Sequence, residues 1–112
     1  MGEPDRVVAL ASRILRRQPK HFAALAYRAE AWLSWERYEE ALQDATTAVA
    51  ATSGGAPRAH AAILACRAAS LLGRVSEAVK WLGEAYVYDL PTARAAMQRD
   101  EVRRLAVVAG YA

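Results

Sequence analysis

One apolar pattern occurs three times along this chain, and the spacing of its copies restricts the fold more than any other sequence feature. The first copy comprises Val7, Val8, Ala11, Ile14 and Leu15. An offset of 34 residues leads to Ala41, Leu42, Ala45, Ala48 and Val49, and an offset of 37 leads to Ala78, Val79, Leu82, Ala85 and Tyr86. Within each copy, spacings of three, four and seven define one face of a helix. A period near 34 accommodates two helices per unit, so the sequence predicts a solenoid of helical hairpins.

The composition agrees with helices joined by short connections. Alanine, which has the best helix propensity, supplies 27 of the 112 residues. We predict five main helices, at about residues 3–17, 20–35, 38–51, 58–72 and 75–88. Pro19 ends the first, and Gly54, Gly55 and Pro57 break the chain before the fourth.

The last part of the chain is helical in composition but has weaker boundaries. We expect one short helix containing Ala93, Ala96 and Met97. A second would be capped by Asp100 and contain Val102, Leu105, Ala106 and Ala109.

These features resemble the tetratricopeptide repeat family over nearly all of residues 6–91. The resemblance rests on the following segments: Tyr27-Arg28-Ala29, Arg37 to Leu42, Ala45 and Ala48, then Leu72-Gly73-Arg74, Glu77-Ala78-Val79, Ala85 and Asp89-Leu90-Pro91. Glu36 stands where the family usually has a turn glycine. The resemblance implies an all-α fold: a right-handed α-solenoid of antiparallel helical hairpins, in which the first helix of each pair lines a concave face.

The implied repeat organisation is a single domain of about two and a half repeats. A half repeat at 4–18 would precede full repeats at 20–53 and 57–90, and a C-terminal capping segment would occupy 92–112.

The concave face predicts a protein-binding groove. Its residues would be Tyr27, Glu30, Ser34, His60, Ile63, Leu64, Arg67 and Leu71. An apolar surface rimmed by a few charges suits a bound peptide or helix of another protein, so we expect an interaction scaffold or adaptor. The open alternative is that the C-terminal segment of the chain itself covers this face.

Some family members hold the acidic C-termini of chaperones through a clamp of Lys, Asn and Arg. Here Tyr27, His60 and Leu64 stand at clamp positions, which leaves Arg67 as the positive charge nearby. The full clamp is therefore not matched.

The first helix raises a second hypothesis, because it corresponds to the second half of a unit without its first half. Its apolar residues would form an assembly surface comprising Val7, Val8, Leu10, Ile14 and Leu15. Such an exposed end favours homodimerisation, pairing with another subunit, or membership of a longer array. RNA binding through the Arg groups near both ends is the least favoured hypothesis, because no aromatic residues alternate with these charges.

The residues that could carry chemistry do not form a catalytic or metal-binding pattern. Cys66 is the one cysteine and is expected to pack as a small hydrophobe. His21 and His60 have no zinc-site spacing. Glu39, Glu40 and Asp44 are expected to be helix-start acids facing solvent. We therefore expect no enzymatic activity, cofactor, metal or small-molecule substrate.

The chain also lacks an apolar run of membrane-spanning length and a secretory apolar core near its start. We expect an intracellular, cytoplasmic protein that does not bind membranes. Trp32, Trp35 and Trp81 are expected to fill a core that the alanines leave shallow, with Trp35 partly exposed at the end of its helix.

Overall fold

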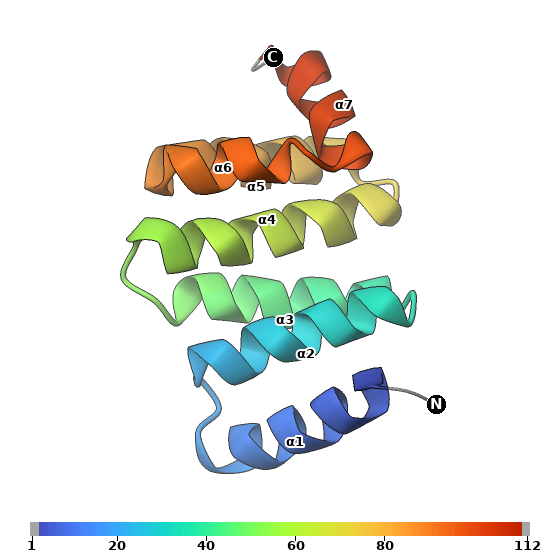
Figure 1. Ribbon diagram of the computed structural model, residues 1–112, viewed down its shortest axis with the longest axis vertical. Helices are drawn as coiled ribbons and strands as arrows, with labels where there is room; N and C mark the ends of the chain where they lie inside the picture. Colours follow the sequence, from blue (N-terminus) through green and yellow to red (C-terminus); the bar gives the residue numbers. More distant parts are fainter. Residues whose placement is uncertain (1–2, 111–112) are drawn as a thin grey trace.

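The computed structural model describes residues 3–110, with side chains from residue 5, and this part of the chain is all-helical (Figure 1). The helices are α1 (Glu3–Arg17), α2 (Phe22–Ser34), α3 (Tyr38–Ala50), α4 (Gly55–Leu71), α5 (Val75–Tyr88), α6 (Leu90–Ala96) and α7 (Asp100–Ala109). From α1 to α6, each helix packs on the next one in the sequence. They stack along the longest axis of a molecule of 40 × 30 × 20 Å, with α1 at one end and α7 at the other. This packing is consistent with a helical repeat.

The five main helices have the predicted bounds to within about three residues, and the fourth helix begins three residues before its predicted start. It starts at Gly55 rather than residue 58, because Pro57 falls in its first turn, where the missing N–H is not needed. Gly54 precedes it with a φ of 134°, a backbone conformation that favours glycine.

The prediction that Asp100 caps a helix is wrong. Asp100 is the first residue of α7, and its carboxylate accepts a hydrogen bond from Arg103 at 2.5 Å. Instead Asp89 caps α6, because its carboxylate accepts from the backbone N–H of Thr92 at 3.1 Å and from the Thr92 hydroxyl at 2.6 Å.

The burial of the three copies of the apolar pattern is greatest in the middle of the stack and least at the α1 end. All five positions of the copy on α3 are buried, from Ala41 to Val49. On α5 three are buried and two are half-buried. On α1 only Ala11 and Leu15 are buried. The core is therefore continuous through the middle of the stack and becomes shallow at the α1 end.

The turns inside the two full hairpins have the same backbone geometry. Glu36 has a φ of 61° and Gly73 a φ of 79°. In each turn the following N–H closes a bond to the carbonyl five residues back, from Arg37 to Trp32 at 2.8 Å and from Arg74 to Ala69 at 2.9 Å. This is the Schellman ending of a helix, which favours glycine at the left-handed position. Glu36 takes that position at a conformational cost.

Replacing Glu36 with glycine should therefore stabilise the protein. We expect Glu36→Gly to raise the free energy of unfolding by about 0.5–1 kcal/mol, because glycine removes the left-handed strain. The measurement is urea unfolding followed by circular dichroism. Glu36→Ala is the matched control: it removes the carboxylate but keeps the strain, so it should give no gain. Gly73→Ala should lose about 1 kcal/mol. Equal effects of Glu36→Gly and Glu36→Ala would contradict the backbone explanation.

Candidate protein-binding surfaces

The predicted groove residues do not form one continuous open surface. Ile63 and Leu64 are only 6% and 1% exposed, so they pack in the core and contribute little open area. Tyr27 is 63% exposed, but it lines a groove beside α1 and does not line the pocket that contains Glu30, His60 and Arg67. Leu71 is exposed near the end of α4, and the Ser34 hydroxyl donates to the Glu30 carbonyl within α2. The structure instead places Glu30, His60, Ile63, Leu64 and Arg67 at one site and Tyr27 at another, whereas Ser34 and Leu71 line neither.

The first site, here called the central pocket, lies between α2, α4 and the C-terminal segment. It has a volume of about 230 Å³. It is lined by five predicted residues: Glu30, His60, Ile63, Leu64 and Arg67. The C-terminal segment adds Thr92, Ala95, Ala96 and Arg99. This segment therefore covers part of the face, as the open alternative anticipated, and leaves a smaller pocket.

The charge in the central pocket is dominated by Arg67 and Arg99. The Arg67 side chain is largely buried, and its Nε lies 3.5 Å from Glu101 Oε1, too far for a well-formed hydrogen bond. Burial lowers the pKa of the Arg67 guanidinium, and the neighbouring Arg99 lowers it further, whereas Glu101 and Glu30 act in the opposite direction. A guanidinium that is partly dehydrated and weakly paired is a strong donor for an incoming carboxylate.

Glu30 and His60 form the other polar side of the central pocket. His60 Nε2 lies 3.3 Å from Glu30 Oε2, and both side chains are about half exposed. This hydrogen bond is the main cause that lowers the pKa of the Glu30 carboxyl. Glu30 therefore stays ionised at neutral pH and is already occupied by His60, which leaves the two arginines as the donors for a ligand.

Arg99 was not among the predicted groove residues. Its role depends on the path of the chain after α6, which places a residue from the last quarter of the sequence beside α4. No spacing in the sequence relates Arg99 to Arg67, so no sequence signal could have paired them.

The second site, here called the N-terminal groove, lies between α1 and α2. It has a volume of about 440 Å³ and is lined by Val7, Leu10, Ile14, Ala23, Ala24 and Tyr27 among others. Leu10 and Ile14 are 56% and 41% exposed. Of the predicted assembly surface, Val7, Leu10 and Ile14 line this groove, Val8 is half-buried away from it, and Leu15 is buried. The structure thus brings the exposed assembly residues together with Tyr27.

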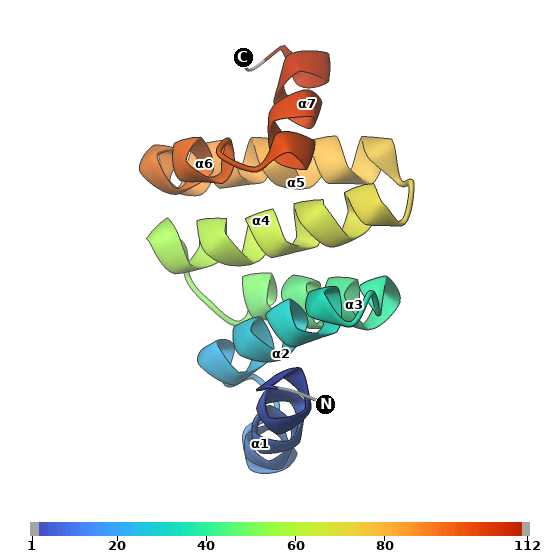
Figure 2. The same ribbon diagram turned by 45° about the vertical axis from the view of Figure 1, so that its right-hand side comes forward.

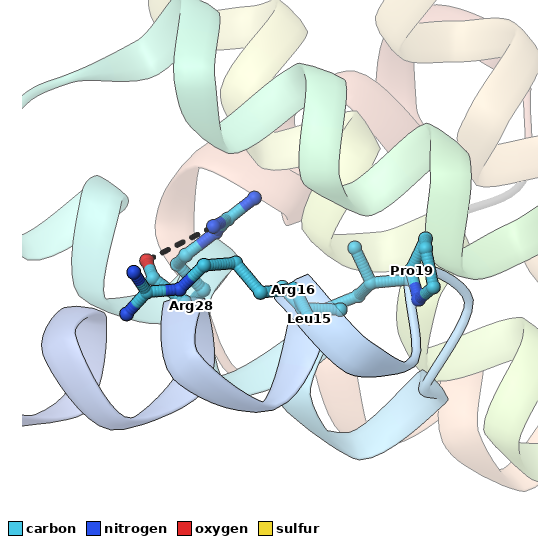
Figure 3. Close-up of a pocket in the computed structure, with 6 residues that line it drawn as sticks. Leu15, Arg16, Pro19 and Arg28 are labelled. Atoms are coloured by element: carbon cyan, nitrogen blue, oxygen red, sulfur yellow. Dashed lines mark hydrogen bonds between the residues drawn. The ribbon is translucent and has the colours of Figure 1, made fainter.

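A third depression lies on another side of the contact between α1 and α2, and Figure 3 shows its lining residues. It is lined by Ser12, Leu15, Arg16, Pro19, Leu25 and Arg28. Arg28 is already engaged there, because its Nη1 donates to Ser12 Oγ at 3.0 Å (Figure 3). Its Nε and Nη2 donate to Asp44. We therefore do not assign a ligand to this depression.

The expectation that Asp44 faces solvent is wrong. Asp44 is only 5% exposed and lies between α2 and α3. Its carboxylate accepts two hydrogen bonds from Arg28, at 2.6 and 2.8 Å, and one from Trp32 Nε1 at 3.0 Å. Asp44 is the main cause that raises the pKa of Arg28. The missed signal was register: Asp44 aligns with Leu10 and with Trp81, which are both apolar, so its position belongs to an inner face.

Removing either partner of this pair should destabilise the protein, and removing both should cost less than the sum. Arg28→Ala leaves a buried carboxylate with only Trp32, and we expect a loss of about 2–3 kcal/mol, a value reduced because Arg28 is about a quarter exposed. Asp44→Ala should cost less, since Arg28 can reach water. Urea unfolding of both variants and of the double variant gives the coupling, which we expect at about 1–2 kcal/mol. Strict additivity would contradict the pairing.

Cys66 is fully buried in α4 and packs as the sequence predicts. Burial raises the pKa of its thiol to about 12, so the thiol is protonated at neutral pH and is a poor nucleophile. Within the part of the chain that the structure describes, no group of three or more His, Cys, Asp or Glu side chains could hold a metal ion.

Labelling of Cys66 by Ellman's reagent should therefore report unfolding. With a pKa of about 12, the thiolate fraction near pH 8 is about 10⁻⁴, against roughly a quarter for an unperturbed thiol. We expect the native chain to react at least ~1000-fold more slowly than the chain in concentrated urea. Free cysteine mixed with the native protein is the control for reagent activity. Rapid labelling of the native chain would show that α4 opens easily.

Comparison with protein-family models, curated proteins and solved structures finds no match for this chain. None of the helices within residues 3–110 has both the length and the apolar character required to cross a membrane.

Proposed function

We propose that this chain is a protein–protein interaction module of the tetratricopeptide type, a right-handed solenoid of about two and a half repeats with a C-terminal cap. Support comes from the threefold apolar pattern, from the shared turn geometry at Glu36 and Gly73, and from the packing of successive helices. In this proposal the chain is an adaptor without enzymatic activity and works in the cytoplasm.

The central pocket is the proposed binding site, and its ligand is a peptide segment with a carboxylate. The observation that carries this proposal is Arg67, which is largely buried beside Arg99 and whose Nε makes no hydrogen bond, although Glu101 lies 3.5 Å away as an ion-pair partner. A carboxylate between the two guanidinium groups would satisfy their donors and reduce their mutual repulsion. Ile63 and Ala96 would contact an apolar side chain next to it.

The pocket is small, so we expect it to hold one or two residues of a peptide rather than a long helix. Its volume of about 230 Å³ is below the range of pockets for drug-sized ligands. Affinity would come mainly from the charge-assisted hydrogen bonds, and it should decrease with salt because Arg99 is exposed.

The test is selection from a displayed random-peptide library, followed by fluorescence anisotropy with the enriched peptides. We expect the enriched peptides to share an acidic residue or a free C-terminal carboxylate. Arg99→Ala should weaken their binding by about tenfold or more, the value of one hydrogen bond between charged groups. Arg104→Ala is the matched control, because Arg104 is an exposed arginine of α7 that does not line the pocket. It should change affinity less than about twofold.

Arg99 is the better target than the buried residues. The sequence alone suggests the double variant Tyr27→Ala with Leu64→Ala. Leu64 is buried, so its replacement would leave a cavity in the core, and a loss of binding could then not be distinguished from unfolding. If no peptide is enriched, or if the enriched peptides lack acids and bind Arg99→Ala equally well, the central pocket is not the binding site.

A further inference from the structure

The N-terminal groove occupies the place that a helix fills one unit further along the stack. Adding 34 to Leu10 and Ile14 gives Asp44 and Ala48, and adding 37 to Tyr27 gives Leu64. Asp44, Ala48 and Leu64 lie on α3 and α4, and α2 covers them: it packs on α3 and also contacts α4. Arg28 and Trp32 of α2 bind Asp44. Asp44, Ala48 and Leu64 are at most 5% exposed.

The equivalent side chains on α1 and α2 are exposed. Leu10, Ile14 and Tyr27 are 56%, 41% and 63% exposed. Figures 1 and 2 show α1 at the end of the stack, with no other described helix beyond it. Equivalent repeat positions are thus buried where α2 covers them, and exposed on α1 and α2, where no described helix covers them.

We propose that the N-terminal groove binds an α-helix of another protein, with an apolar face of small residues and an acidic flank. The occupant is a helix because the equivalent position between α3 and α4 holds one. Its face is largely apolar because Leu10 replaces Asp44, so the guest needs no basic residue at the position of Arg28. An acid at that position would lie beside Leu10, one helical turn from Arg6 and Arg13. It carries small residues because Ala11, Ala23 and Ala24 line the groove and allow a close approach of the two helices.

The acidic flank follows from a row of arginines on α1. An α-helix turns by 100° per residue, which places Arg6, Arg13 and Arg17 on one side of α1, next to Leu10. All three are exposed. No ion pair links any of them to a side chain within residues 5–110. A helix lying in the groove would run beside this row, so acids on its near flank would be attracted and bases repelled.

The same arginines argue against a second copy of this chain as the occupant. An antiparallel twofold contact of α1 with its copy would bring the arginine row of one copy beside that of the other. A head-to-tail contact would use the exposed Val107 and Val108 of α7, which alternate around that helix with Arg103 and Arg104. Both arrangements place like charges together, which costs free energy.

The test uses two synthetic peptides built on the sequence of α2, Phe22–Ser34, because α2 fills the equivalent position. One peptide carries Arg28→Glu, and the matched peptide keeps Arg28. Each is titrated into the isotope-labelled full chain, and amide shifts are followed by NMR. We expect shifts concentrated on α1 and the first half of α2. The glutamate peptide should have a dissociation constant on the order of 10–100 µM and bind at least about fivefold more tightly than the arginine peptide, with the difference reduced at high salt.

Variants of the full chain separate the groove from other apolar surface. Leu10→Asp should weaken binding of the glutamate peptide at least about tenfold, because it introduces a charge at the centre of the contact. Val108→Asp, at another exposed apolar residue, is its control and should leave binding unchanged. Arg13→Glu should reverse the preference between the two peptides. Both Leu10 and Val108 are exposed, so neither change should affect folding, which thermal unfolding will check.

Several results would overturn the proposal. These are the absence of shifts with either peptide, equal affinity for both peptides, or binding that survives Leu10→Asp. Sedimentation analysis supplies a further one: a dimer of the wild-type chain that Leu10→Asp dissociates would make a second copy the occupant. The proposal does not rest on the central pocket, since Arg99→Ala should leave these titrations unchanged, so the two proposals can fail separately.

Discussion

Close contact between helices through buried alanines is the constraint on which the rest of this structure depends. Ala41, Ala45 and Ala48 on α3 are fully buried, as are the inner alanines of α4. A methyl group holds neighbouring helix axes close, and the backbones then pack with few voids. Only a few of the fully buried positions hold larger side chains, such as Leu64 and Leu82. A carboxylate buried in such a core needs specific partners, because burying an unpaired charge costs free energy.

Asp44 meets this requirement, and its position explains how the two hairpins came to differ. In the first hairpin the aligned positions hold Arg28 and Asp44, which bind each other across α2 and α3. In the second hairpin the same register holds Ala65 and Trp81, so bulk replaces the ion pair. At α1 the position holds Leu10 and faces open space. One register position therefore holds an exposed apolar residue, a paired carboxylate and a space-filling indole in successive units. The side chain and the helix that lies over it together determine the role.

The helices could be predicted from the sequence because their local signals agree. Apolar periodicity, glycine and proline positions and the 34-residue repeat all identify the same segments, and the observed bounds differ by only a few residues. The predicted concave site was less successful for a physical reason. A repeat register says which residues point toward a face, but it does not say whether another segment lies over them. The position of α6 and α7 is determined by the Asp89 cap, by burial of Val102 and by the approach of Glu101 to Arg67, which are long-range contacts without a period. Ile63 and Leu64 were therefore expected at a surface, and Arg99 was not expected at the site.

The two ends of the stack are closed to different degrees, and this difference follows from what each terminal helix can bury. At the C-terminal end, α7 turns Val102, Leu105 and Ala106 onto α4 and α5 and completes the core there. At the other end, α1 packs only one side of its apolar face, on α2, and the opposite side remains open along Leu10 and Ile14. A solenoid end that is uncovered and apolar usually lowers solubility, and natural arrays protect it with a polar outer face. The exposed arginines of α1 lie beside the groove without covering it. In the proposal made above, their charge would disfavour a second copy and favour a helix of opposite charge.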